Sequence, residues 1–369
     1  MVRISRDEEI EDLARGMVLL GTGGGGDPYV GALYLQSEVH AGKFPELISA
    51  ADIDDDAFVL SVFGIGAPTA ILEGLLSRRT LMEIVDRAEK HFGRKIDALV
   101  SGEIGGVNTL FPLGLGAALD IPILDADGMG RAFPHIEMTT FSIFGCPSTP
   151  ALIMDELGNS IVLHTVDDQT SEKLSRSISA DLGAITWGAF YPMTGRDVKA
   201  TAVHGSVTQA WEIGRCIREA RLNSDDVVNA LADHMNEGGA RFAKVLFQGK
   251  VTDVAREIRN SWDFALITIA GSGDSKQKFT IELQNEFIVA RIDGEPVCLV
   301  PDMICVVQSD SGEPLTGEML TYGQRVSVIG YQAHPMLRHP KSIAVCGPRQ
   351  FGVDEDFKPI EELVDQQSN

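Results

Sequence analysis

Acidic side chains follow two short apolar runs of this chain, and their types suit acid–base chemistry. Glu103 comes after "DALVS", and Asp125 and Asp127 come after "IPIL". Residues two apart on an extended segment point to the same side, so the two aspartates could share a proton or bind a divalent metal ion. Alternatively, "DADG" is an ordinary turn in which aspartate bonds to nearby backbone. All three acids are candidate catalytic residues, and the two aspartates are candidate metal ligands.

The segment "GRAFPHIEM" directly follows these acids. Arg131 could hold a substrate carboxylate through two parallel hydrogen bonds, or it could be the counter-charge of buried acids. His135 could be a metal ligand, a proton carrier or an ordinary packed residue. Both residues are candidates for substrate binding, and Glu137 lies beside them.

A run of glycines in "GTGGGGDPY" is costly to order, because glycine loses more backbone entropy on folding than any other residue. Successive glycine N–H groups can converge on an anion, and the helix expected to begin at Asp27-Pro28 adds a positive end. Asp27 would compete with a phosphate for the same backbone N–H groups. A dinucleotide site also needs a strand before the glycines, whereas the sequence predicts a helix there. We therefore expect no nucleotide, and either a small ligand or a tight helix–helix connection. The candidate binding residues here are Gly23, Gly24, Gly25, Gly26 and Asp27.

In the second half of the chain, "QNE" interrupts an alternating apolar strand. A run of polar residues on a strand must place one side chain inward, which requires polar partners or a site. Asn285 and Glu286 are the candidates, and an edge or a turn is the alternative.

The elements around these residues predict a two-part α/β protein. Apolar strands at 57–66, 96–106 and 120–130 alternate with helical patterns at 80–93 and 107–120, which favours a parallel sheet covered on both faces. Ligands of such sheets bind beyond the carboxyl ends of the strands, where the acids lie.

The second half is mostly β after helices near 206–221 and 224–237. Residues 278–308 alternate with period two and turn at Asp293-Gly294, and "QRVSVIGYQA" and "SIAVCG" suggest further strands. We expect an α/β domain over residues 1–167 and a β-rich domain over 168–369, whose last residues could pack back on the first.

Composition narrows the class of function. The chain has 369 residues and a formal net charge of −22, which disfavours nucleic acid and anionic membrane surfaces as partners. Five scattered cysteines without CxxC spacing indicate reduced thiols in a cytoplasm, and no apolar run reaches the roughly 20 residues of a membrane span. A homo-oligomer is expected only because such assemblies are common.

Several motifs together resemble the S-methyl-thiohydantoin desulfurase-like family. They are "LGTGGGGDPY", "SGEIGGVNTLFPLG", "IPILDADGMGRAFPHIEM", "LQNEFIVA", "VPDMI" and "GPRQFGVD", and they cover nearly the whole chain in order. The resemblance implies a two-part architecture, hydrolytic removal of a sulfur substituent from a hydantoin-like ring, and company with hydantoinase- and oxoprolinase-type enzymes. The family usually has Glu where this chain has His135, so no catalytic role is carried over to that residue.

For such a reaction, Glu103, Asp125 and Asp127 could supply a base or hold a divalent metal that activates water. Backbone N–H groups at Gly23–Gly26 and at Gly105 and Gly106 could hold ring carbonyl oxygens. Asn108 and Asn285 could bond to ring amides. The alternative is a non-catalytic subunit or sensor that binds the same ligand beside a hydantoinase- or oxoprolinase-type enzyme.

Overall fold

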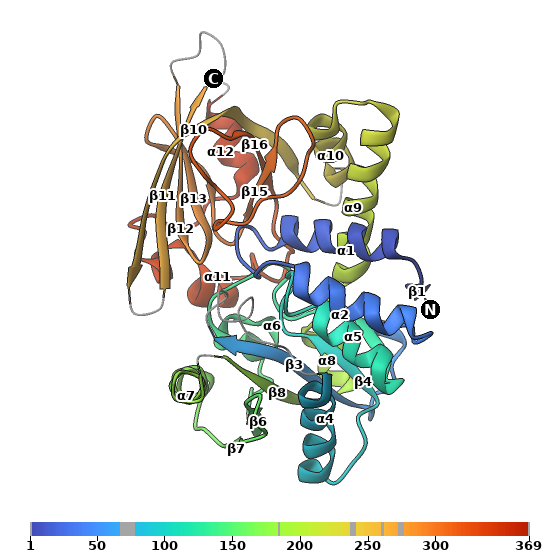
Figure 1. Cartoon of the computed structure of the whole chain (residues 1–369). Coiled ribbons are helices and arrows are strands. Elements are labelled where there is room, and N and C mark those ends of the chain that lie inside the picture. Colours follow the sequence, from blue (N-terminus) through green and yellow to red (C-terminus); the bar gives the residue numbers. More distant parts are fainter. Residues whose placement is uncertain are drawn as a thin grey trace. The chain divides into compact units, whose positions relative to one another are not determined.

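The computed structural model describes residues 2–66, 78–183, 185–236, 241–259, 262–271 and 277–367. The chain forms two compact units, which can be followed in Figure 1. The first unit holds residues 1–14, 26–129 and 135–208, and the second holds residues 15–25, 130–134 and 209–369. The chain thus passes between the units several times, and helix α1 (Asp7–Leu20) is divided between them. Among the described residues, no helix is long and apolar enough to cross a membrane.

A mixed sheet forms the centre of the first unit. Its strands are β1 (Val2–Arg3), β2 (Glu46–Ser49), β3 (Phe58–Gly66), β4 (Ala98–Ser101), β5 (Ile123–Asp127), β6 (Ala151–Met154), β7 (Ser160–Leu163), β8 (Ile185–Thr194) and β9 (Val203–His204). They lie in the order β1-β2-β5-β4-β3-β8-β6-β7, and β9 pairs with β5. β2, β5, β4 and β3 are parallel, whereas the other pairs are antiparallel. The predicted parallel strands of an α/β fold are confirmed.

The helices of the first unit include amphipathic ones, which bury one face, and one that is apolar on every side. They are α2 (Tyr29–His40), α4 (Arg78–Phe92), α5 (Leu110–Leu119), α6 (Thr140–Ile143), α7 (Asp168–Asp181) and α8 (Gly195–Thr201), with 3₁₀ turns η1 (Ala50–Asp52) and η2 (Ile136–Met138). α4 buries one face at helical spacing, through Leu81, Ile84, Val85 and Ala88. α5 is apolar on every side and buries residues 110–118, so it lies within the core.

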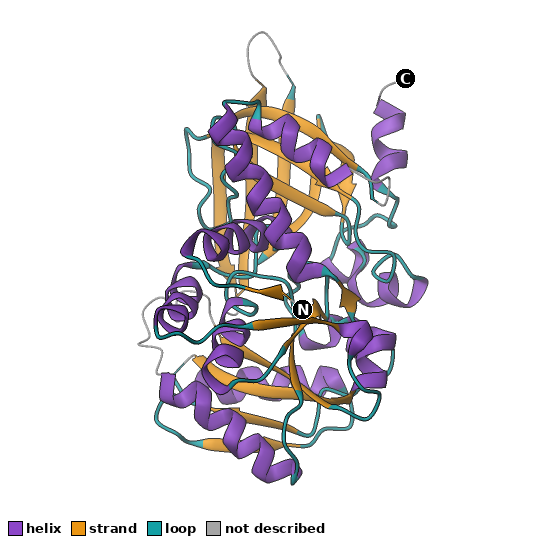
Figure 2. Ribbon diagram, turned by 90° about the vertical axis from the view of Figure 1, so that its right-hand side faces the viewer, coloured by secondary structure: helices purple, strands orange, loops and turns teal. Residues whose placement is uncertain are grey.

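The second unit is built on an antiparallel sheet of seven strands. The strands are β10 (Ala243–Arg259), β11 (Trp262–Gly271), β12 (Lys278–Gln284), β13 (Glu286–Ile292), β14 (Glu295–Leu299), β15 (Met303–Gln308) and β16 (Arg325–Tyr331). Their order is β14-β13-β12-β11-β10-β16-β15. Figure 2 shows them as the long orange ribbons. The β-rich second domain predicted from the alternating pattern is confirmed.

The helices of the second unit are α9 (Ser206–Asn223), α10 (Val227–Asn236), α11 (Pro340–Cys346) and α12 (Ile360–Gln367), with the 3₁₀ turn η4 (Pro348–Phe351). The first three residues of α9 belong to the first unit. α9 and α10 match the predicted helices, although residue 237 lies outside the described residues. The turn between β13 and β14 lies at Asp293-Gly294 as predicted, with φ of 50° and 95°.

One predicted strand is wrong. "SIAVCG" lies in helix α11, because Pro340 occupies its first turn and His339 Nδ1 accepts a hydrogen bond from the Lys341 N–H at 3.2 Å. Cys346 consequently lies at the C-terminal end of a helix and not at the end of a strand. A short apolar run fits either structure, and only the proline before it favoured a helix.

Candidate functional site

The carboxyl ends of β3 and β4 are joined by polar side chains in the first unit. Asn108 Nδ2 donates to Glu103 Oε1 at 2.8 Å, and Asn108 Oδ1 accepts from the Gly64 N–H at 3.0 Å. Because both ends of the amide are bonded, Asn108 fixes the Glu103 carboxylate relative to the end of β3. Glu103 itself is half-buried. The structure thus brings two of the predicted site residues together.

The loop that carries Glu103 is also held from within. Thr109 is fully buried, and its Oγ1 donates to the Glu103 carbonyl at 2.9 Å and accepts from the Gly105 N–H at 3.2 Å. Gly106 allows a close approach, since a Cβ there would lie 2.5 Å from the Gly26 carbonyl oxygen. Hydrogen bonds therefore fix the backbone of this loop, and the side chains that the loop carries are held in place with it.

Asp127 connects the loops that follow β4 and β5. It is fully buried, and its Oδ2 accepts hydrogen bonds from the Ile104 N–H at 3.0 Å and the Met129 N–H at 2.8 Å. A carboxylate between two backbone donors stabilises the ends of both strands. Asp127 thus shapes the loop that carries Glu103.

Asp125 bonds instead to the beginning of α9. Its Oδ1 accepts from the Thr208 N–H at 2.9 Å and its Oδ2 accepts from Thr208 Oγ1 at 2.6 Å. A carboxylate at the first turn of a helix satisfies a backbone donor that has no partner within the helix. The two aspartates of "DADG" therefore have different partners, although they lie two residues apart on one strand.

The glycine run is divided between the units. In the second unit, a Cβ on Gly23 would lie 2.8 Å from the Phe287 ring, and one on Gly24 would overlap the Glu286 carboxylate. Gly23 and Gly25 also have φ of 91° and 75°, which side chains rarely adopt. Packing and backbone conformation thus explain why these positions are glycine.

In the first unit, Gly26 has φ of 74°, and a Cβ there would lie 2.7 Å from the Val107 side chain. Asp27 Oδ1 accepts from the N–H of Tyr29, the first residue of α2, at 2.8 Å, although Pro28 and not Asp27 occupies the N-cap position. The run therefore joins two helices, which was one of the two interpretations of the sequence.

Asn285 forms the connection between β12 and β13 in the second unit. It has φ of 58°, its N–H donates to the Asp263 carbonyl at 2.8 Å, and its Oδ1 accepts from the Asp263 N–H at 2.9 Å. This pairing attaches the turn to the start of β11. Glu286 follows as the first residue of β13 and is 5 % exposed.

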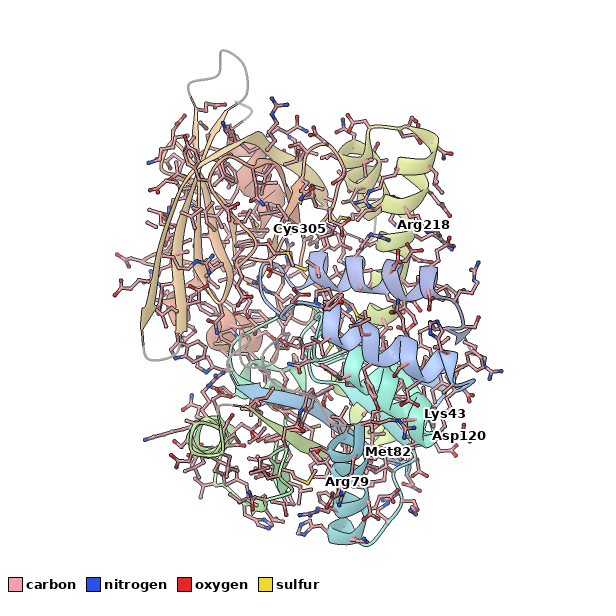
Figure 3. The ribbon with its side chains drawn as sticks, in the orientation of Figure 1. Lys43, Arg79, Met82, Asp120, Arg218 and Cys305 are labelled. Atoms are coloured by element: carbon pink, nitrogen blue, oxygen red, sulfur yellow. The ribbon has the colours of Figure 1, made fainter. Side chains whose placement is uncertain are left out.

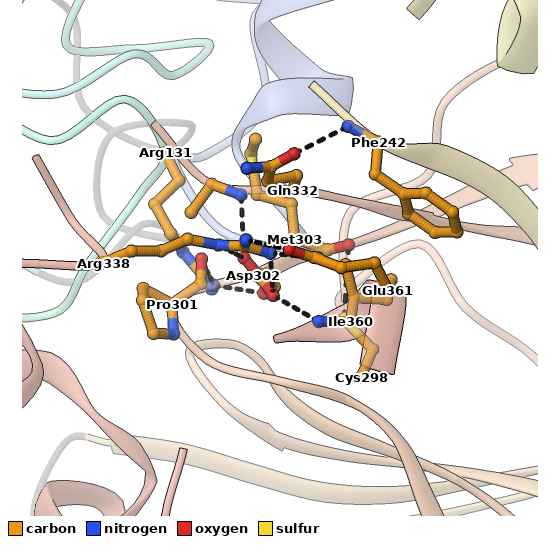
Figure 4. Close-up of polar contacts among 11 residues, drawn as sticks. Arg131, Phe242, Cys298, Pro301, Asp302, Met303, Gln332, Arg338, Ile360 and Glu361 are labelled. Carbon is orange, nitrogen blue, oxygen red and sulfur yellow. Dashed lines mark hydrogen bonds and ion pairs between the residues drawn. The ribbon is translucent and has the colours of Figure 1, made fainter. Parts of the chain in front are cut away.

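Arg131 is fully buried in the second unit and donates to protein carbonyls (Figure 4). Its Nε bonds to Ala132, one terminal nitrogen bonds to Pro301 and Asp302, and the other bonds to Phe287, at 3.0–3.1 Å. Burial lowers the pKa of this guanidinium, an effect that the nearby Glu286 carboxylate opposes. Arg131 holds residues 130–134 to β13 and to the turn between β14 and β15.

A second buried network surrounds Asp302 (Figure 4). Its two carboxylate oxygens accept from Arg338 at 2.8 and 2.6 Å and from the N–H groups of Ala333 and Ile360 at 2.8 and 2.9 Å. Arg338 also pairs with Glu361 at 2.7 Å. Burial raises the pKa of Asp302 despite this pairing. The network attaches the beginning of α12 to the turn before β15 and to the segment that follows β16.

His135 lies directly before η2 in the first unit. Its Nδ1 is 3.5 Å from Glu172 Oε1 on α7, and Glu172 also pairs with Arg176. Among the described residues, His135, Glu137 and Glu172 form the one group of three His, Cys, Asp or Glu side chains whose ligand atoms lie within 4.8 Å of one another. His135 and Glu137 stand out in the sequence, whereas Glu172 carries no local signal of its role.

An open hollow of about 650 Å³ lies on α4 beside the end of α5. Figure 3 labels Arg79 and Met82, which line it together with Arg78, Glu83, Asp86 and Leu119. Leu119 ends α5, whereas the Glu103 loop precedes that helix, so about 14 Å of helix separates the two at ~1.5 Å per residue. The hollow contains none of the predicted site residues.

Comparison with known proteins finds a family match for both halves of the chain. The family model "S-Me-THD-like, N-terminal domain" matches residues 8–165, and "S-Me-THD-like, C-terminal domain" matches residues 166–360. A crystal structure of a protein from Chromobacterium violaceum matches with a TM-score of 0.80 at 21% identity, covering 98% of this chain and 100% of that one. At that identity the likeness shows a shared fold. No curated protein matches the sequence. Since the two models together span nearly all of the sequence, the chain belongs to the S-Me-THD-like family, the S-methyl-thiohydantoin desulfurase-like family that its motifs resemble.

Proposed function

We propose that this protein is a hydrolase that removes methanethiol from an S-methyl-thiohydantoin-like ring. The observation that carries the proposal is the match to both domains of the S-Me-THD-like family over residues 8–360. In the reaction, the oxygen of water bonds to the ring carbon that bears sulfur, and the carbon–sulfur bond breaks. One proton from water goes to the departing sulfur and the other goes to the ring nitrogen, so the products are a hydantoin and methanethiol.

Glu103 is the acid that best fits the role of general base. It is half-buried at the carboxyl end of a parallel strand, where ligands of such sheets bind. Asp125 has both oxygens on Thr208, and Asp127 Oδ2 holds two backbone N–H groups. In this proposal Glu103 takes the proton from water, while the two aspartates maintain the loops around it.

Asn108 acts as a positioning residue for Glu103. Its amide bonds to the carboxylate on one side and to the end of β3 on the other, which fixes the direction of the carboxylate lone pairs. A base held in one orientation needs less reorganisation when it takes a proton. Loss of Asn108 should therefore lower kcat more than it raises KM.

The test is hydrolysis of a 5-substituted S-methyl-thiohydantoin by the full chain. Released methanethiol is measured with a thiol reagent, and the hydantoin is measured by mass spectrometry. Glu103→Gln keeps the shape of the side chain and should lower kcat/KM by about 10²–10⁴-fold, the usual contribution of a general base. The exposed Glu295→Gln on β14 is the matched control and should leave the rate unchanged.

Two outcomes would contradict the proposal. Full activity of Glu103→Gln would show that Glu103 is not the general base. Tight binding of the ring by the wild-type protein without release of methanethiol would instead indicate a ligand-binding subunit, the alternative weighed for the sequence.

A further inference from the structure

Three side chains that can bind metal ions converge in the first unit, away from the Glu103–Asn108 pair in the sequence. His135 precedes η2, Glu137 lies within it, and Glu172 lies on α7. Their ligand atoms all lie within 4.8 Å of one another. The set offers one imidazole nitrogen and two carboxylate oxygens from two separate elements.

Glu172 is held in place by its neighbours. Its side chain is 8 % exposed, its Oε2 accepts from the Ile136 N–H at 3.0 Å, and Arg176 contacts its other oxygen. The carboxylate is therefore fixed between α7 and η2.

Glu137 supplies a second, independent observation. Its Oε2 is buried, and among the described residues that oxygen has no hydrogen-bond partner. A buried acceptor without a partner is costly, and the Glu137 carboxylate also belongs to a group in which its ligand oxygen lies within 4.8 Å of a Glu172 oxygen. A cation between the two carboxylates would satisfy the oxygen and offset their repulsion.

The donor set and its spacing suit a small transition-metal ion. Tetrahedral zinc with bonds of about 2.0–2.1 Å places its ligand atoms roughly 3.4 Å apart. His135 Nδ1 and Glu172 Oε1 are already 3.5 Å apart. An imidazole favours Zn²⁺ over Mg²⁺ or Ca²⁺, which prefer oxygen ligands alone.

We propose that His135, Glu137 and Glu172 bind one divalent transition-metal ion, with Zn²⁺ the best fit. Three protein ligands leave a fourth position for water, the arrangement of catalytic rather than structural zinc sites. Arg176 stays paired with Glu172 and limits the local negative charge before the ion binds. The site is separate from the Asp125–Asp127 pair that the sequence suggested.

The test is titration of the full chain with ZnCl₂ by calorimetry after removal of bound metals, with MgCl₂ as a comparison. We expect about one Zn²⁺ per chain and much weaker binding of Mg²⁺. His135→Ala and Glu137→Gln should each weaken Zn²⁺ binding by about 100-fold or more, because each removes a ligand. His204→Ala and Glu295→Gln, both at exposed positions, are the matched controls and should leave the affinity unchanged.

Cobalt provides a second measurement. Co²⁺ at the site should give a visible absorption band that His135→Ala abolishes. Zn²⁺ bound at well below one per chain, or with equal affinity in both variants, would overturn the proposal. If His135→Ala does not fold, Glu137→Gln decides alone, since it keeps the shape of the side chain. The titration contains no substrate, so its outcome is independent of whether the chain hydrolyses thiohydantoins.

Discussion

At the scale of single residues, the second unit compensates the charges of two arginines, Arg131 and Arg338, in different ways. Arg338 is paired with carboxylates of Asp302 and Glu361, whereas the hydrogen bonds of Arg131 end on four backbone carbonyls. Carbonyl dipoles compensate a buried charge only when several point at it together. The arrangement around Arg131 therefore depends on the planar fork of arginine and on the backbone of residues 287 and 301–302.

This dependence predicts that lysine cannot replace Arg131. Arg131→Lys keeps the charge but has one nitrogen for the four carbonyls that three guanidinium nitrogens now reach. We expect a loss of about 3 kcal/mol in the free energy of unfolding, measured by urea denaturation. Arg349→Lys is the control, since Arg349 is 56 % exposed and pairs with surface aspartates. A loss at Arg131 no larger than that of the control would contradict the assignment.

The candidate site was only partly predictable at this scale. Glu103 and Asn108 lie on one short loop after a strand, so their proximity follows from local spacing. The partner of Asp125 could not be foreseen, because Thr208 is brought to β5 by strand β9 and the beginning of α9. Glu172 likewise reaches His135 only because α7 packs beside η2, a tertiary contact with no sequence pattern.

At the scale of elements, the beginning of α1 shows how a helix end depends on one carboxylate. Glu9 Oε2 accepts from the N–H groups of Ser5 and Arg6 at 2.8 and 3.0 Å, and its other oxygen pairs with Arg6. Burial raises the pKa of Glu9, but these hydrogen bonds outweigh burial and lower it below the ordinary 4.5. The folded state thus favours the charged form.

A lowered pKa makes the contribution of Glu9 dependent on pH. It is complete above pH 4.5 and is lost as the pH falls through the lowered pKa of the folded state. Glu9→Gln should therefore cost about 1 kcal/mol near pH 7, and the difference from wild type should close in acid. Urea denaturation across this pH range is the measurement. Glu8→Gln removes the same charge from a side chain that is 48 % exposed, and it should show little effect at any pH.

The success of sequence-based prediction at the element scale follows from pattern length. The runs at 57–66, 96–106 and 120–130 are apolar, separated by helices and bounded by glycine or aspartate, so parallel strands were the consistent solution. "SIAVCG" is too short for its period to distinguish helix from strand, and the prediction failed there. The antiparallel pairs of β3 with β8 and of β8 with β6 join distant segments, which no local pattern indicates.

At the scale of the whole molecule, the sheet of the first unit draws on residues beyond the end of the N-terminal family match. That match ends at residue 165, whereas β8 (Ile185–Thr194) lies between β3 and β6, and β9 pairs with β5. A chain that stopped near residue 167 would lose the strand that joins two parts of this sheet. It would expose the edge of β3, a buried strand of nine residues.

We therefore predict that a fragment of residues 1–167 fails to fold, whereas a fragment of residues 1–208 is substantially more soluble and richer in β-structure. Both fragments contain the segments 15–25 and 130–134, so they share any cost of separating these from the second unit. The comparison thus isolates the contribution of residues 168–208, which carry α7, β8, α8 and β9. Soluble yield and far-ultraviolet circular dichroism after expression under identical conditions are the measurements. A cooperative unfolding transition in the 1–167 fragment would show that the remaining strands form a stable sheet without β8.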